Sequence, residues 1–207
     1  MTITKDEKRS AGRPRSFDRE QLIEKVMHLF WDRGYRDLSF NEIATATGLT
    51  RASLYNSFKS KEALFFEALR NYSSSTPDVL FTKVKEGEPV GPVFYQVFAH
   101  AARLRATEEK KRGCFTVNCF SELAGDDSQV GKELSVLMEE KRSVIAGLIN
   151  QAVRQKELPK GTDAETTANM VMAFLSGFSL FSKGGADEAT LYSMCTSFLK
   201  QIGFKTP

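Results

Sequence analysis

Residues 40–58 read FNEIATATGLTRASLYNSF, a stretch that predicts two short helices joined by a tight turn. Gly48 can adopt the positive φ that a sharp turn between helices requires, and Ala44 is small enough for the second helix to cross closely above it. The crossing would be held by a set of apolar side chains, namely Ile43, Leu49, Leu54 and Phe58. The pattern favours a DNA-binding helix-turn-helix, although helix pairs joined by a glycine also occur in proteins of other kinds.

The second of these helices would have a polar outer face made mostly of short side chains. Its members are Thr50, Arg51, Ser53, Tyr55, Asn56 and Ser57. Short polar side chains allow a helix to approach base edges and phosphates in the major groove. We therefore expect this face to bind double-stranded DNA.

Helical signals continue along the chain, and strand signals are nearly absent. Ser39 and Glu42 form a capping box, Thr50 and Ser60 are in N-cap positions, and Asp18 precedes the first helix. Pro77 either bends or ends the fourth helix. The sequence predicts an all-α fold of about nine helices, near residues 19–33, 39–47, 51–58, 61–83, 93–106, 114–123, 128–156, 163–183 and 187–202.

The positive charge is concentrated at the N-terminus. Residues 1–61 contain 12 Lys and Arg against 8 Asp and Glu, whereas the remaining residues contain 17 against 18. This asymmetry suggests a small module that faces a polyanion, attached to a larger body that is nearly neutral.

Other classes of protein are disfavoured. No apolar run approaches the roughly 18–20 residues that span a bilayer, and the polar, basic start, Met1 to Ser16, does not look like a secretory signal. The three cysteines are too few for a disulfide scaffold and lack metal-ligand spacing, so we expect reduced thiols in a cytoplasmic protein and no metal site. We also expect no cofactor. The two histidines, His28 and His100, have no nucleophile at motif spacing, so we expect no catalytic residues and no enzymatic activity.

Residues 17–66 resemble the N-terminal domain of the TetR family of bacterial repressors. The resemblance lies in Ile43-Ala44 with Thr47-Gly48, in the run Leu54 to Phe58, and in the run Lys61 to Phe65. It implies a homodimer whose two helix-turn-helix heads read a palindromic operator. It also implies a DNA-binding domain over residues 17–62, preceded by a basic flexible arm over 1–16, and an effector-binding and dimerisation domain over 63–207.

The resemblance also implies roles for individual residues of the head. Thr50, Arg51 and Ser53 stand at the start of the recognition helix, where base contacts are expected. Arg51 is the best candidate for a bidentate pair with guanine. Asn56 stands where many family members have histidine, so we include it as a contact without a defined partner.

Further residues match positions that bind the DNA backbone. Ser39, Tyr55 and Lys61 are expected to contact phosphates. Lys61 also lies in the first turn of its helix, where a cation is unusual unless it faces a phosphate. The alternative for Lys61 is an ordinary solvated lysine. Arg13 and Arg15 belong to a Gly-Arg-Pro-Arg arm that suits a narrow minor groove. The alternative for the arm is a solvated tail.

The C-terminal body is expected to dimerise through the last two helices and to bind a small-molecule effector. Sixteen phenylalanines favour a hydrophobic or aromatic effector, although most such rings simply form core. The expected effector-binding residues are Phe94, Phe98, His100, Cys114, Phe115, Asn118, Phe174 and Phe178, with Leu104, Phe120 and Met138 as further pocket candidates. For His100, a structural role is the alternative.

Cys114 follows Lys110, Lys111 and Arg112 at a predicted helix start, and both the cations and the helix dipole favour the reactive thiolate. Residues 113–118 resemble a TetR subgroup in which some members sense electrophiles or oxidants through a cysteine. The alternative is a small buried hydrophobe. A second alternative concerns the whole protein, which would be an architectural or cell-division DNA-binding protein with no small-molecule inducer.

Overall fold

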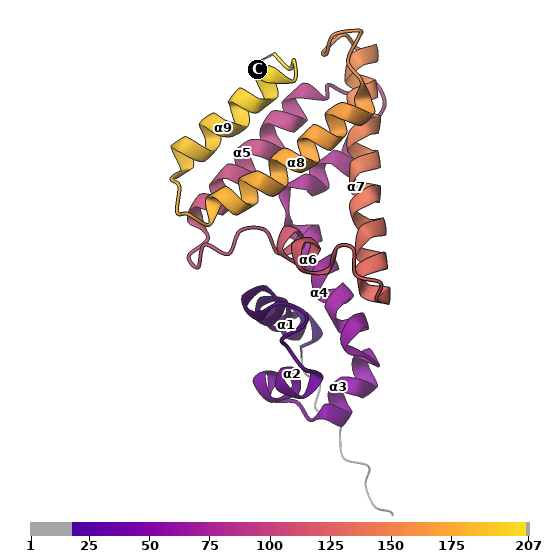
Figure 1. The fold of residues 1–207 in the computed structure, drawn as a ribbon, viewed down its shortest axis with the longest axis vertical. Coiled ribbons are helices and arrows are strands. Elements are labelled where there is room, and N and C mark those ends of the chain that lie inside the picture. The colour runs from indigo at the N-terminus through magenta and orange to yellow at the C-terminus, as the bar shows by residue number, and fades with distance from the viewer. Residues whose placement is uncertain (1–17, 206–207) are drawn as a thin grey trace, which may run out of the picture.

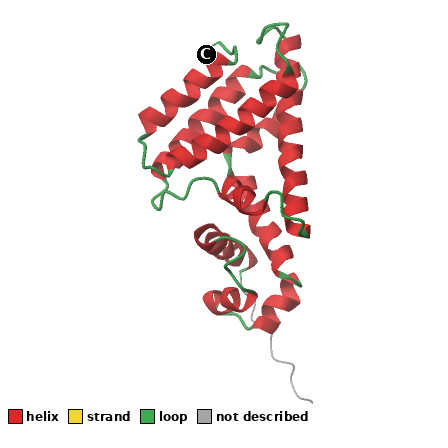
Figure 2. Cartoon of the chain, in the orientation of Figure 1, coloured by secondary structure: helices red, strands yellow, loops and turns green. Residues whose placement is uncertain are grey.

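The computed structural model describes residues 18–205, and within that range the chain is helical with no strand (Figures 1 and 2). The expected all-α fold is confirmed. The bounds are α1 Arg19–Arg33, α2 Phe40–Thr47, α3 Arg51–Phe58, α4 Lys61–Ser75, η1 Pro77–Lys83, α5 Gly91–Thr107, α6 Phe115–Leu123, α7 Gln129–Arg154, α8 Ala164–Ser182 and α9 Glu188–Gln201. Arg13 and Arg15 of the predicted arm lie outside the described residues.

The helix-turn-helix is formed by local capping contacts, as the sequence indicates. The Ser39 side chain accepts from the Glu42 N–H and the Glu42 side chain accepts from the Ser39 N–H, so the capping box is complete. Gly48 ends α2 in the left-handed conformation at φ 74°. The Thr50 side chain then caps α3 by accepting from the Ser53 N–H.

The fourth predicted helix is divided at Pro77. α4 ends at Ser75, and Thr76 adopts an extended conformation at ψ 151°. A residue that precedes proline is driven out of the helical region by the proline ring. The chain resumes as the short 3-10 helix η1, so proline ends the helix rather than bending it.

Two buried cores are built along the long axis of the molecule. The first core is formed by α1, α2, α3, α4, α6 and the start of α7, and it includes Phe65, Phe115 and Leu134. The second joins η1, α5, α7, α8 and α9. Figure 1 shows α2 and α3 at one end of the long axis and the C-terminal helix α9 toward the other, with α4 and α6 between them.

The body core is rich in aromatic contacts between α5, α8 and α9. The rings of Phe174 and Phe198 stack with centroids 4.1 Å apart, and the Phe98 ring lies 5.8 Å from that of Phe174.

Among residues 18–205, no helix has both the length and the apolar character that a membrane crossing requires.

Candidate nucleic-acid interface and effector cavity

Helix α3, the second helix of the helix-turn-helix, is fixed on its inner side by buried side chains. Leu54 and Phe58 are fully buried in the first core, which leaves the opposite side of this two-turn helix free. Arg51, Ser53, Tyr55 and Asn56 are all exposed. Tyr55 is 56% exposed, although a tyrosine ring carries a large apolar surface. The polar side chains expected to face outward are therefore exposed on a helix that lies at one end of the molecule (Figure 1).

Hydroxyl groups on this surface have structural partners already. Thr50 Oγ1 accepts from the Ser53 N–H (3.1 Å) and donates to Ser53 Oγ (3.0 Å). The Ser39 hydroxyl accepts from the Glu42 N–H (3.2 Å). Hydrogen bonds from Ser39 and from Arg33 to the Glu42 carboxylate lower the pKa of Glu42 to about 2. Arg51 forms no ion pair with any carboxylate of residues 18–205, so its guanidinium keeps its donors for another partner.

Lys61 is held in place by an aromatic ring. Its Nζ lies 4.1 Å from the centroid of the Tyr35 ring, and the Tyr35 hydroxyl donates to Glu62 Oε1 (2.9 Å). Burial lowers the pKa of the Lys61 ammonium. The side chain is therefore more ordered than a solvated lysine, and the ring contact offers an explanation for a cation in the first helical turn.

A cavity of about 450 Å³ lies in the body between the end of α4, η1, α5, α6, α7 and α8. Two of the effector-binding residues expected from the sequence, Cys114 and Phe178, line it, as does Met138. The remaining expected residues do not line it.

Helical periodicity explains why the other expected residues lie elsewhere. On α5 the cavity side is the stripe Val97, Ala101 and Arg105, so Phe94 and Phe98 point into the body core instead. Phe94, Phe98 and Phe174 lie in or against the body core, and Phe115 and Phe120 lie in or against the first core. His100 and Leu104 are exposed. Asn118 also lies away from the cavity, and its Nδ2 donates to the Arg112 carbonyl (2.9 Å).

The polar residues of the cavity wall that were not expected from the sequence include Tyr72, Arg105 and Thr116. Arg105 Nη2 donates to the Tyr72 hydroxyl (3.0 Å), and that hydroxyl donates to Cys114 Sγ (3.5 Å). Arg105 could have been found, because it lies four residues after Ala101 and eight residues after Val97, a spacing that places all three on one side of a helix. No sequence signal distinguishes Tyr72 or Thr116 from ordinary core residues.

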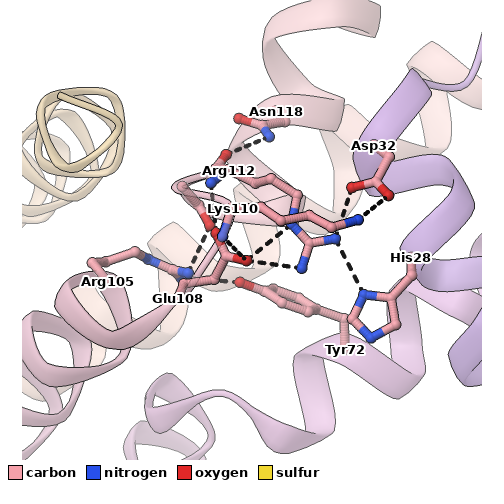
Figure 3. A network of polar contacts seen from close by, with 9 residues as sticks. His28, Asp32, Tyr72, Arg105, Glu108, Lys110, Arg112 and Asn118 are labelled. Carbon is pink, nitrogen blue, oxygen red and sulfur yellow. Dashed lines mark hydrogen bonds and ion pairs between the residues drawn. The ribbon is translucent and has the colours of Figure 1, made fainter. Parts of the chain in front are cut away.

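A short loop between α5 and α6, residues 108–114, contacts both the cavity wall and α1. Figure 3 shows Glu108, Lys110 and Arg112 of this loop beside Asp32 and His28 of α1. At one end, Arg105 Nη1 donates to the Gly113 carbonyl (2.7 Å), and the Cys114 N–H donates to Ser179 Oγ on α8 (2.7 Å). Gly113 has φ 75°, and a Cβ there would lie 2.9 Å from the Ser179 carbonyl oxygen, so this close approach requires glycine.

At the other end of the loop, Arg112 binds α1. Its Nη1 donates to Asp32 Oδ1 (2.9 Å) and its Nη2 to Glu108 Oε1 (2.9 Å), while the guanidinium lies 4.0 Å from the Trp31 ring centroid. Lys110 forms a second ion pair with Asp32 (2.6 Å). Although burial raises the pKa of Asp32, the hydrogen bonds from the two cations hold it below its ordinary value. The loop is therefore in direct contact with the cavity wall and with α1.

Comparison with known proteins agrees with this architecture. Residues 22–68 match the bacterial regulatory proteins of the tetR family, and residues 94–198 match the tetracyclin repressor-like C-terminal domain. The HTH-type transcriptional repressor ComR of Escherichia coli K12 is 27% identical over 197 residues, which cover 93% of this chain and 92% of ComR. The repressor BdcR of the same organism is 32% identical over 115 residues, covering 56% of this chain and 58% of BdcR.

Solved structures show the same fold. A cysteine-substituted variant of the TetR family regulator CifR, in complex with 26-bp operator DNA, superposes with a TM-score of 0.78 at 24% identity, covering 94% of this chain and 100% of CifR. A second CifR variant with the same length of operator gives a TM-score of 0.77 at 25% identity, covering 91% of this chain and 98% of that one. Since the two family matches together span the head and most of the body, the chain belongs to the tetR family of bacterial regulatory proteins.

Proposed function

We propose that this protein is a transcriptional repressor that binds a palindromic operator as a homodimer and leaves it when a small molecule occupies the cavity beside Cys114. The observation that carries the proposal is the exposed polar side chains of α3, a helix that buried Leu54 and Phe58 hold against the first core. ComR and BdcR, which are named transcriptional repressors, and CifR, which was solved with operator DNA, support it. Such a protein would act in the cytoplasm, where bacterial DNA lies.

The cavity favours a regulator that responds to a ligand over an architectural DNA-binding protein. A volume of about 450 Å³ with a mostly apolar wall is in the range of small-molecule sites. The loop 108–114 offers a physical route from this cavity to α1, because Arg105 holds Gly113 and Arg112 holds Asp32.

Arg51→Ala is expected to weaken binding to the DNA site that the wild-type chain selects by about 10-fold to 100-fold. The reason is that a bidentate arginine–guanine pair contributes about 1–3 kcal/mol of discrimination. Fluorescence anisotropy with a labelled duplex measures the loss. Arg103→Ala, which removes an exposed arginine from α5 in the body, is the matched control and should bind as the wild type does. Equal affinities for the two variants would refute the role of Arg51.

Dimerisation through α8 and α9 is supported by apolar side chains left exposed in the single chain. Leu180 is 67% exposed and Phe181 50% on α8, and Met170 on α8 and Tyr192 on α9 are exposed as well. Large apolar residues left exposed can mark a site of association.

Leu180→Glu is expected to convert the dimer to monomers, because a carboxylate would be buried in an apolar contact. Sedimentation velocity at micromolar concentration would detect the change. Val136→Glu, at an equally exposed apolar position on α7 (59%), should remain dimeric. A Leu180→Glu protein that stays dimeric would exclude this pair of helices as the interface.

Cys114 is the thiol through which we propose that an electrophilic effector acts. Cys119 and Cys195 are buried, and burial raises the pKa of both thiols, that of Cys195 to about 12, so their reactive thiolate forms are scarce. Cys114 is only half-buried and lines the cavity.

At pH 7.5 N-ethylmaleimide is expected to modify Cys114 before the other two thiols. The sulfur adds to one alkene carbon, and the other takes a proton from water. Mass spectrometry of digested protein gives the order of modification, and operator release by the reagent should be lost in Cys114→Ser. Faster modification of Cys119 or Cys195, or unchanged release in Cys114→Ser, would contradict this role.

A further inference from the structure

Arg105 carries a charge at the cavity wall and forms no ion pair with a carboxylate of residues 18–205. Burial lowers the pKa of Arg105, but neighbouring groups, including the charge of Asp78 from a distance, raise it above its ordinary value. The side chain is largely buried, and its two hydrogen bonds go to uncharged oxygens, the Gly113 carbonyl and the Tyr72 hydroxyl. Two acidic residues also line the cavity, but Asp78 forms an ion pair with Lys141 (2.7 Å) and Glu140 is exposed to solvent. Arg105 is therefore a largely buried cation that has no carboxylate within ion-pair distance among the described residues.

Such an arrangement is costly unless a partner completes it. A buried charge is usually paired, because its lost hydration must be replaced by opposite charge and hydrogen bonds. Arginine has five N–H donors in a planar fork, which matches the two oxygens of a carboxylate. Two of these donors are occupied here, and the side chain borders an open cavity, so donors are left for a ligand.

A second polar group in the same cavity also lacks a partner. Thr116 is 4% exposed, and its Oγ1 is buried with no hydrogen-bond partner in the described part of the chain. Thr116 follows Cys114 by two residues and, like Arg105, lines the cavity. A hydroxyl in this position can donate to an oxygen of a bound molecule.

Much of the rest of the cavity wall is apolar, although serines, threonines and the ion-paired Asp78 and Lys141 also line it. The apolar part includes Val97, Leu137, Met172, Leu175 and Phe178, contributed by α5, α7 and α8. A ligand that combines one small anionic group with an apolar body would match both Arg105 and this apolar part of the wall.

We infer that the cavity binds an amphipathic carboxylate, with its anionic group on Arg105 and Thr116 and its apolar body along α5, α7 and α8. The inference rests on the proposed function only in taking this cavity as the effector site. Since Tyr72 links Arg105 to Cys114, the bound anion lies beside the loop 108–114 that contacts the head.

Isothermal titration of the full-length chain without DNA tests the inference with two probes of equal length, decanoate and decan-1-ol. At pH 7.5 the wild type is expected to bind decanoate at least tenfold more tightly than decan-1-ol. Arg105→Met should bind the two probes equally. Arg103→Met removes an exposed arginine two residues away on the same helix and should keep the preference for decanoate.

Three results would overturn the inference: equal affinity for the two probes in the wild type, binding of neither, or a preference for decanoate that survives in Arg105→Met. If Arg105→Met fails to fold, decylammonium provides the test in the wild type, because it should bind more weakly than decan-1-ol; tighter binding would refute the anion site. Operator binding by the ligand-free chain is measured separately. Its absence would refute the proposed repressor and leave the probe comparison intact.

Discussion

Replacing Phe115 by alanine is expected to lower the free energy of unfolding by about 3–5 kcal/mol. The ring is fully buried, with centroids 5.6 Å from Tyr72, 6.1 Å from Trp31 and 6.3 Å from Phe65. Its removal leaves a cavity where α6 joins α1 and α4. Urea denaturation followed by circular dichroism measures the loss.

The control for this prediction is Val136→Ala on α7. Val136 is 59% exposed, so its truncation should change the free energy of unfolding by less than about 0.5 kcal/mol. If Phe115 belonged to the effector site, as its sequence context suggests, Phe115→Ala would alter ligand binding at unchanged stability. That result would contradict its assignment to the core.

Arg112→Met is expected to lower the free energy of unfolding by about 2–4 kcal/mol, because it leaves carboxylates at a poorly hydrated site without their cation. The side chains of Arg112 and Glu108 are each 14% exposed, and the guanidinium also stacks on Trp31. Lys110→Met removes a cation from the same Asp32, but the Lys110 side chain is 61% exposed. That control should cost less than about 1 kcal/mol.

The pH dependence gives this prediction a second readout. The folded pKa values of Asp32 and Glu108 are lowered, so their contribution to stability is present above the pKa values of the unfolded chain and is lost as pH falls through the folded values. The difference between Arg112→Met and the wild type should therefore shrink in strongly acidic solution. Equal losses for Arg112→Met and Lys110→Met, or a difference that does not change with pH, would contradict a buried ion-pair network.

The head could be predicted from the sequence because its determinants are local. The Ser39–Glu42 capping box, Gly48 and the Thr50 cap each act within a few residues, so their spacing indicates where α2 and α3 begin and end. The family resemblance added the expected roles of individual side chains, which remain predictions. Tyr35, which holds Lys61, could not be foreseen, since the two residues meet only after α1 and α4 pack together.

The cavity was harder to predict because residue type does not reveal which side of a buried helix a residue occupies. Phe98 and Phe178 are both buried phenylalanines, yet Phe178 lines the cavity and Phe98 fills the core between α5, α8 and α9. Arg105 was overlooked for the opposite reason, since a charged residue near a helix end is usually solvated. Its importance depends on tertiary contacts with Tyr72 and Gly113.

The most direct test of DNA reading by α3 is selection of binding sites from a random pool of duplexes by the 207-residue protein. We predict an inverted repeat whose half-sites are centred about one helical turn, about 10 bp, or a multiple of it apart. In each half-site, one G·C preference should be lost when Arg51→Ala is used for the selection. Recovery of duplexes with no shared motif, or an identical motif with Arg51→Ala, would contradict the assignment of this face as the DNA-reading surface.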